Sequence, residues 1–158
     1  MLICSLMFIL CILVSIMTGF IWGLKYSEAE ILKLKNFSLK HWAMFQLLCK
    51  WVKEEDKIVR FISAGQYKEI GIYGMSYMGD CLAAVLKKAG YQNVYGFDKN
   101  ADRLYNPSII LYNLEENIPD VDIVIVTTMF SDIELNKDLE VKFGKYTDII
   151  SLENILFE

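Results

Sequence analysis

The chain has 158 residues, 54% of them hydrophobic, and a formal net charge of −4 at pH 7. The acidic balance argues against nucleic acid as a partner, because a phosphate backbone requires a basic protein surface. Four cysteines without zinc-ligand spacing and a single histidine argue against a metal site. These features leave a small globular domain with one additional segment as the expected organisation.

The first 24 residues carry no charged side chain. As a helix of about 1.5 Å per residue they would span roughly 36 Å, which exceeds the hydrocarbon core of about 30 Å. Trp22 and Tyr26 would lie at the membrane interface. We therefore predict a transmembrane anchor over residues 1–24. A cleaved signal peptide fits less well, since a basic leading region and a small-residue cleavage site are missing, and a misassigned start codon is a further alternative.

Charge then predicts an orientation. Residues 25–60 contain eight basic and five acidic side chains, whereas residues 61–158 contain eight basic and fifteen acidic ones. Because positive charge accumulates on the cytoplasmic side of an anchor, the expected location is the cytoplasmic membrane, single-pass, with the C-terminal domain in the cytoplasm.

Residues 25–66 read as a helical connector. Its apolar positions recur at helical spacing and are Ile31, Leu34, Phe45, Leu48 and Val52. Leu39, Trp42 and Cys49 make this face broader than a two-stranded coiled-coil seam, so we expect the connector to pack against the core. Asn36-Phe37-Ser38 predicts a break in the helix, with Ser38 as an N-cap. Residues 63–65 are expected to close a second, short helix.

The third segment, residues 67–158, opens with a characteristic unit. Residues 70–73 have the length and composition of a strand, residues 74–79 form a glycine turn, and residues 78–89 follow a helical pattern that stops at Gly90. A second strand over residues 93–97 ends on Asp98. A strand, glycine turn, helix and strand with an acidic end are typical of one half of a dinucleotide-binding fold.

Each residue type in the turn has a physical role. Gly74 lets the chain reverse off the strand, and Gly79 lets the helix pack close to the sheet. The first N–H groups of the helix would face a pyrophosphate, and Asp98 would accept hydrogen bonds from a ribose. Ser76 stands where a second glycine is typical. Its Cβ would leave less room for the ligand phosphates to approach the backbone, whereas its hydroxyl could donate a hydrogen bond to them. The predicted site comprises Gly74, Met75, Ser76, Tyr77, Met78, Gly79, Asp98, Thr127 and Thr128.

The rest of the chain continues the strand and helix alternation. Strands are predicted over residues 109–112, 122–127 and 148–151, with a helix over residues 132–143. The five strands fit a doubly wound parallel α/β sheet of order 3-2-1-4-5. In that order strands one and four diverge at a crevice, and Thr127 and Thr128 end the fourth strand there.

The stretches IYGMSYMG, YGFDKN and VDIVIVTTMF carry a resemblance. Over residues 37–158 the chain resembles the small Rossmann-like modules of bacterial surface-polysaccharide and glycosyltransferase gene clusters. It is also similar to the nucleotide-binding N-terminal domains of sugar acyltransferases and membrane-bound sugar-nucleotide dehydratases. The resemblance implies a Rossmann-like fold, binding of NAD or NADP or of a nucleotide-sugar, a glycosyltransferase partner, and a setting near cell-envelope polysaccharide synthesis.

No catalytic set of residues accompanies the predicted binding site. The one histidine, His41, precedes the core, no G-x-S-x-G turn occurs, and Asp80 stands where a P-loop places lysine. We therefore expect a membrane-tethered module that binds a dinucleotide or sugar nucleotide. The alternatives are a ligand-free adaptor that recruits a glycan-assembly enzyme, and a small NAD-dependent sugar-nucleotide enzyme completed by a partner.

Overall fold

The structure is a computed structural model that describes residues 2–54, 56–128 and 133–157, with the backbone alone for residues 2–16, 20, 21, 133 and 134. It contains two compact units, Met1–Trp42 and Ala43–Glu158. The predicted segment boundaries after residues 24 and 66 come from sequence patterns and stay predictions.

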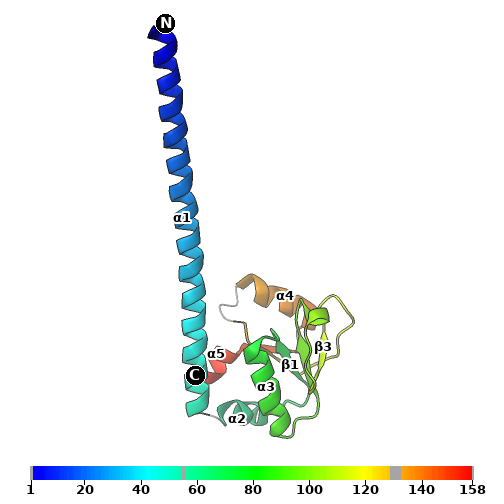
Figure 1. Ribbon diagram of the computed structural model, residues 1–158. Helices are drawn as coiled ribbons and strands as arrows, with labels where there is room; N and C mark the ends of the chain where they lie inside the picture. The colour runs from blue at the N-terminus through cyan, green and yellow to red at the C-terminus, as the bar shows by residue number, and fades with distance from the viewer. Residues whose placement is uncertain (1, 55, 129–132, 158) are drawn as a thin grey trace. The chain divides into compact units, whose positions relative to one another are not determined.

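The first unit belongs to a single helix, α1 (Leu2–Lys53), whose last turns lie in the second unit (Figure 1). The predicted break at residues 36–38 is wrong, because α1 runs through it. Asn36 and Ser38 lower helix propensity by less than about 0.7 kcal/mol each, and neither removes a backbone donor as proline would. His41 supports the helix here, since its Nδ1 lies 2.9 Å from the Phe37 carbonyl oxygen.

The predicted membrane anchor is corrected by the structure. Among the described residues, none belongs to a helix that is long and apolar enough to cross a membrane. The predicted single-pass location in the cytoplasmic membrane, and the orientation that depended on it, are therefore withdrawn.

The second unit is a doubly wound parallel α/β sheet, a Rossmann-like arrangement. Its strands are β1 (Ile70–Tyr73), β2 (Val94–Phe97), β3 (Ile110–Tyr112), β4 (Ile123–Val126) and β5 (Asp148–Ser151). They form one sheet of order β3-β2-β1-β4-β5, and every neighbouring pair is parallel. The predicted fold class and strand order are confirmed for this unit. β1 and β4 are buried throughout, as expected for central strands covered on both faces.

Helices cover the two faces of the sheet (Figure 1). They are α2 (Lys57–Ala64), α3 (Tyr77–Lys88), α4 (Ile133–Phe143) and α5 (Leu152–Phe157), with a short 3₁₀ turn η1 (Ala101–Arg103). Ile70 and Ile72 of β1 face a core shared by α2, α3, α5 and the end of α1. Tyr73 faces the other core, which contains Leu139 of α4. Alternate side chains of one strand thus supply both cores.

Sequence patterns located most of these elements but not all. The helix predicted over residues 132–143 appears as α4, and residue 132 itself lies outside the described residues. The residues after the last predicted strand, for which no element was predicted, form α5, which buries Leu152, Ile155 and Leu156. Six residues are too few for a helical period to stand out, so packing on the sheet decides this segment.

Two aspartates at the amino end of the sheet hold the loop before β1 by hydrogen bonds. Asp122 Oδ2 accepts the N–H groups of Lys68 at 2.7 Å and Glu69 at 2.9 Å, and these bonds lower the pKa of Asp122. Tyr67 donates its hydroxyl to Asp148 Oδ2 at 2.6 Å. The hydrogen bond to Asp148, and then desolvation, raise the pKa of Tyr67 to about 12.

A pH prediction follows for Tyr67. Its folded pKa of about 12 lies above the unfolded value of 10.0, so the native state holds this proton more tightly. The contribution to stability is complete below about pH 10 and declines between about pH 10 and 12. We expect the gap in unfolding free energy between the wild type and Tyr67→Phe to shrink over this range, as measured by urea denaturation at fixed pH. A gap that stays constant from pH 9 to 12 would contradict the assignment.

Candidate functional site

The glycine turn joins β1 to α3 at the carboxyl edge of the sheet. Gly74 has φ +93°, a conformation that favours glycine. A Cβ there would lie 2.6 Å from Thr128 Cγ2, while a Cβ at Gly79 would lie 2.5 Å from the Gly74 carbonyl oxygen. Both glycines are therefore needed for the tight turn and for the close approach of α3 to it, the two roles expected from the sequence.

The four residues between these glycines divide into two pairs. Met75 and Met78 bury their side chains, with 3% and 2% exposed, and belong to the core beneath α3. Ser76 and Tyr77 are exposed. The methionines thus place only their backbone at the predicted site, and the side chains available to a ligand are those of Ser76 and Tyr77.

Ser76 is the N-cap residue of α3, with φ −93° and ψ −164°. This extended conformation is open to any residue, so serine causes no strain where the fingerprint has glycine. Its hydroxyl makes no capping hydrogen bond within the described structure. The Ser76 hydroxyl is therefore available to a ligand at the start of α3.

Asp98 follows β2 and reaches back to the turn. Its Oδ2 accepts the N–H of Met75 at 2.9 Å, and its Oδ1 accepts the N–H of Asn100 at 2.8 Å. The carboxylate therefore fixes the first residue after Gly74 as well as its own loop. Because each carboxylate oxygen has two lone pairs, each retains one position for a further donor.

The end of β4 closes the other side of the turn. Thr127 is buried, and its hydroxyl lies 2.5 Å from the Gly74 carbonyl oxygen and 3.1 Å from that of Tyr73, so it serves as the donor to this pair. Thr128 is half-buried, and its Oγ1 is buried without a hydrogen-bond partner among the described residues. The structure thus brings Gly74, Asp98, Thr127 and Thr128 together where β1 and β4 separate.

A conservative change tests the role of Thr127. Thr127→Val keeps the shape of the side chain but removes the only proton that its hydroxyl offers to the Gly74 carbonyl. We expect a loss of about 0.5–1.5 kcal/mol in the free energy of unfolding, the net value of one hydrogen bond, because the Gly74 carbonyl keeps the Ser76 N–H and the Tyr73 carbonyl keeps the Thr127 N–H as donors. Urea denaturation measures this loss. Thr147→Val is the comparison, since Thr147 makes similar bonds to Val121 and Phe143 away from the turn. Retained wild-type stability in Thr127→Val would contradict the role.

The described charged side chains next to the turn are the carboxylates Asp80 and Asp98. Asp80 lies in the first turn of α3, where a carboxylate is stabilised by the positive end of the helix dipole. Burial, and then the neighbouring Asp98 carboxylate, raise the pKa of Tyr73 just before Gly74. Among the described residues, no group of three or more His, Cys, Asp or Glu side chains is arranged to hold a metal ion.

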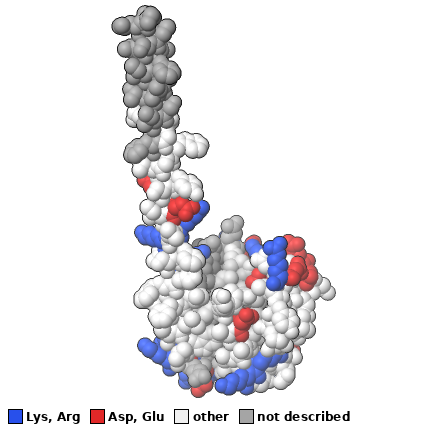
Figure 2. All heavy atoms as spheres, viewed as in Figure 1, with Lys and Arg blue, Asp and Glu red and all other residues white. Residues whose placement is uncertain are grey.

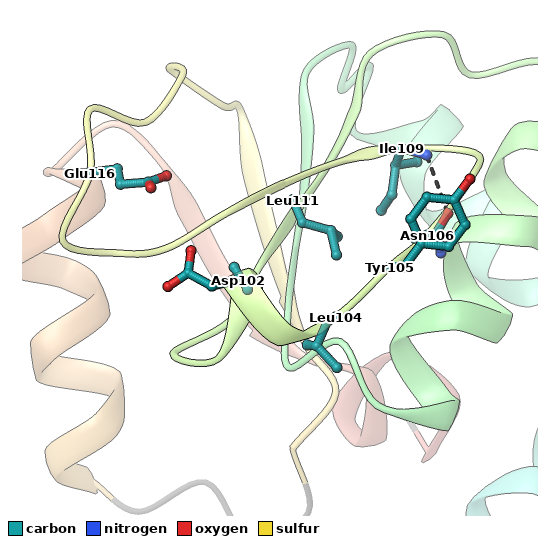
Figure 3. Close-up of a pocket in the computed structure, with 8 residues that line it drawn as sticks. Asp102, Leu104, Tyr105, Asn106, Ile109, Leu111 and Glu116 are labelled. Atoms are coloured by element: carbon teal, nitrogen blue, oxygen red, sulfur yellow. Dashed lines mark hydrogen bonds between the residues drawn. The ribbon is translucent and has the colours of Figure 1, made fainter.

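A hollow of about 330 Å³, which no sequence pattern indicated, lies near the start of α3. Its lining consists of Ala101, Asp102, Leu104, Tyr105, Asn106, Ile109, Leu111 and Glu116. Figure 3 shows the carboxylates of Asp102 and Glu116 on one side and Tyr105 with Asn106 on the other. Asn106 connects the hollow to the first turn of α3, because its Nδ2 donates a hydrogen bond to Asp80 Oδ1 at 3.1 Å. The Asn106-Pro107 pair predicts a turn but not the residues that it would contact.

No family model, curated protein or solved structure matches this chain. The fold of the second unit is thus established by its own sheet, and the family resemblance of the sequence motifs stays an interpretation.

Proposed function

We propose that the α/β unit binds the nucleoside diphosphate group that NAD, NADP and sugar nucleotides share. The observation that carries this proposal is the glycine turn, with Gly74 at φ +93° leading directly into the N-terminus of α3. The first intrahelical bond of α3 is donated by Asp80, to the Ser76 carbonyl oxygen. The preceding N–H groups of the helix are left for a ligand or solvent. A diphosphate is the ligand chemistry that such a terminus favours.

The surroundings of the turn support the same ligand. Asp98 retains one acceptor position on each oxygen, which suits the two hydroxyls of a ribose. The hollow next to Asp80 and Asn106 offers apolar side chains, Leu104 and Leu111, for the nucleoside. Crevices at the carboxyl ends of strands, where the strand order reverses, are the usual ligand position in open α/β sheets. A glycosyltransferase partner and a role in polysaccharide synthesis rest on the resemblance alone and stay predictions.

A ligand-free scaffold is the second candidate, and one observation favours it. Both oxygens of Asp98 and the hydroxyl of Thr127 already have protein partners. The turn is therefore held in its conformation without a ligand. In this case the glycines serve packing alone, and the unit would act as an adaptor for another protein.

Ligand titration separates the two candidates. We expect isothermal titration calorimetry of the full chain to detect binding of NAD or of a UDP-sugar, and a ligand at 100 times its Kd to add about 2.7 kcal/mol to stability. NADP carries one phosphate more than NAD. Because Asp102 and Glu116 of the hollow are negatively charged, we expect NADP to bind more weakly than NAD. If all three ligands give neither heat of binding nor a rise in Tm, the scaffold candidate stands.

Ser76 gives a sharper test of the proposed phosphate contact. Because its hydroxyl makes no cap bond, Ser76→Ala should weaken binding by about 0.5–1.5 kcal/mol, the net value of one hydrogen bond. Ser76→Gly should weaken binding by a similar amount, and calorimetry on both variants measures the change. Ser63→Ala, on α2, is the matched control and should bind as the wild type does. Tighter binding by Ser76→Gly alone would show that the Cβ obstructs the ligand and that the hydroxyl makes no contact.

A further inference from the structure

The first unit exposes an unusual number of large apolar side chains. Leu24, Ile31 and Leu34 of α1 are 51%, 61% and 65% exposed, and neighbouring residues are similar. Figure 2 shows acidic and basic side chains among the uncharged ones on the described part of this helix. Many large exposed apolar side chains on one element mark an interaction site.

The apolar residues follow a heptad. Met17, Leu24, Ile31 and Ser38 are seven residues apart and occupy one position, a. Phe20, Ser27, Leu34 and His41 follow three residues later in each heptad and occupy position d. We call these eight residues the α1 seam. An a and d pattern over more than three heptads is typical of helices that wind around one another.

The residues beside the seam indicate which helix pairs with it. In a parallel coiled coil the g residue of one helix faces the e residue five positions later in its partner. Glu30 at g and Lys35 at e have this offset and opposite charges. Phe37 at g and Trp42 at e have the same offset and are both aromatic. Leu32 and Leu39 lie at b, so the exposed apolar face of α1 is broader than its a, d, e and g positions.

We propose that residues 17–42 of α1 form a parallel, in-register coiled coil with the same segment of a second copy of this chain. In that register Glu30 of each copy faces Lys35 of the other, so the contact is made twice. An antiparallel arrangement would set g against g and e against e, which loses this match. Because Ser27, Ser38 and His41 interrupt the apolar seam, association is moderate and depends on protein concentration.

Charge reversal tests the register. Sedimentation velocity of the full chain should give the mass of two copies, and E30K or K35E should each weaken association about 2- to 30-fold, since two exposed pairs are lost. The double variant E30K/K35E should restore association. Lys40→Glu, at the outward c position, is the control and should associate as the wild type does. A monomeric wild type at about 50 µM protein, or a double variant no better than the single ones, would overturn the proposal.

A second pair of variants distinguishes association through the α1 seam from non-specific association of exposed apolar side chains. Ile31→Asp with Leu34→Asp should give a monomer. Leu32→Asp with Leu39→Asp makes the same chemical change at the b positions, which are 58% and 51% exposed, and should remain dimeric. All four residues lie outside the core of the α/β unit, so both variants should keep the wild-type Tm of that unit. Equal masses for the two variants would exclude the α1 seam as the interface.

Discussion

Gly74→Ala should destabilise the α/β unit by about 2–5 kcal/mol, the largest effect we expect from a single methyl group in this protein. Two causes add. A side chain is strained at φ +93°, and its Cβ would lie 2.6 Å from Thr128 Cγ2 and 3.1 Å from Thr127 Oγ1. Thr127 cannot easily give way, because it holds the turn through its hydroxyl, and the Thr128 backbone nitrogen would also lie 3.4 Å from the new Cβ. Urea denaturation gives the loss of unfolding free energy.

Gly90→Ala is the matched control for this prediction. Gly90, after α3, has φ +96°, but a Cβ there meets nothing within 4 Å. We therefore expect only the backbone strain of about 1–2 kcal/mol. The difference between the two variants isolates the contact of the turn with the end of β4. Equal losses at Gly74 and Gly90 would mean that β4 does not constrain the turn.

Asp98→Ala should lower the unfolding free energy by about 2–4.5 kcal/mol, because the part-buried bond from the Met75 N–H contributes about 1.5–3 kcal/mol and the exposed bond from the Asn100 N–H about 0.5–1.5 kcal/mol. The Met75 and Asn100 N–H groups lose their acceptor together. Thermal and urea denaturation of the purified variant measure the effect. Asp102→Ala, at an exposed position of η1, should change stability by less than about 0.5 kcal/mol.

Asp98 also separates the two candidate functions. Asp98→Asn keeps one side-chain oxygen as an acceptor, so we expect a smaller loss of stability than in Asp98→Ala. If the proposed ribose contact exists, nucleotide affinity should still fall in this folded variant, because the negative acceptor is gone. If folded Asp98→Asn binds nucleotide as tightly as the wild type, Asp98 does not contact the ligand, and its role is only to hold the turn.

The sequence alone determined the α/β unit and most of its elements. Ile123-Val124-Ile125-Val126 could be read as a central parallel strand because strands covered on both faces lose the polar alternation. Gly74 marked the turn because its positive φ favours glycine, and Gly79 because only glycine allows so close a backbone approach. The order 3-2-1-4-5 was predicted because a glycine turn after the first strand and an acidic end of the second are typical of the dinucleotide-binding arrangement.

Only the tertiary structure decided how the predicted site residues are used. Asp98 is held by Met75 N–H and Thr127 by the Gly74 carbonyl across distant parts of the chain, and such pairings follow from strand register, which no local pattern specifies. The tertiary structure also decided α5, which is too short to stand out, whereas α1 continues across residues 36–38 because Asn36 and Ser38 weaken a helix too little to end it. Local residue preferences amount to fractions of a kcal/mol per residue, whereas continued backbone hydrogen bonding and burial act over the whole element.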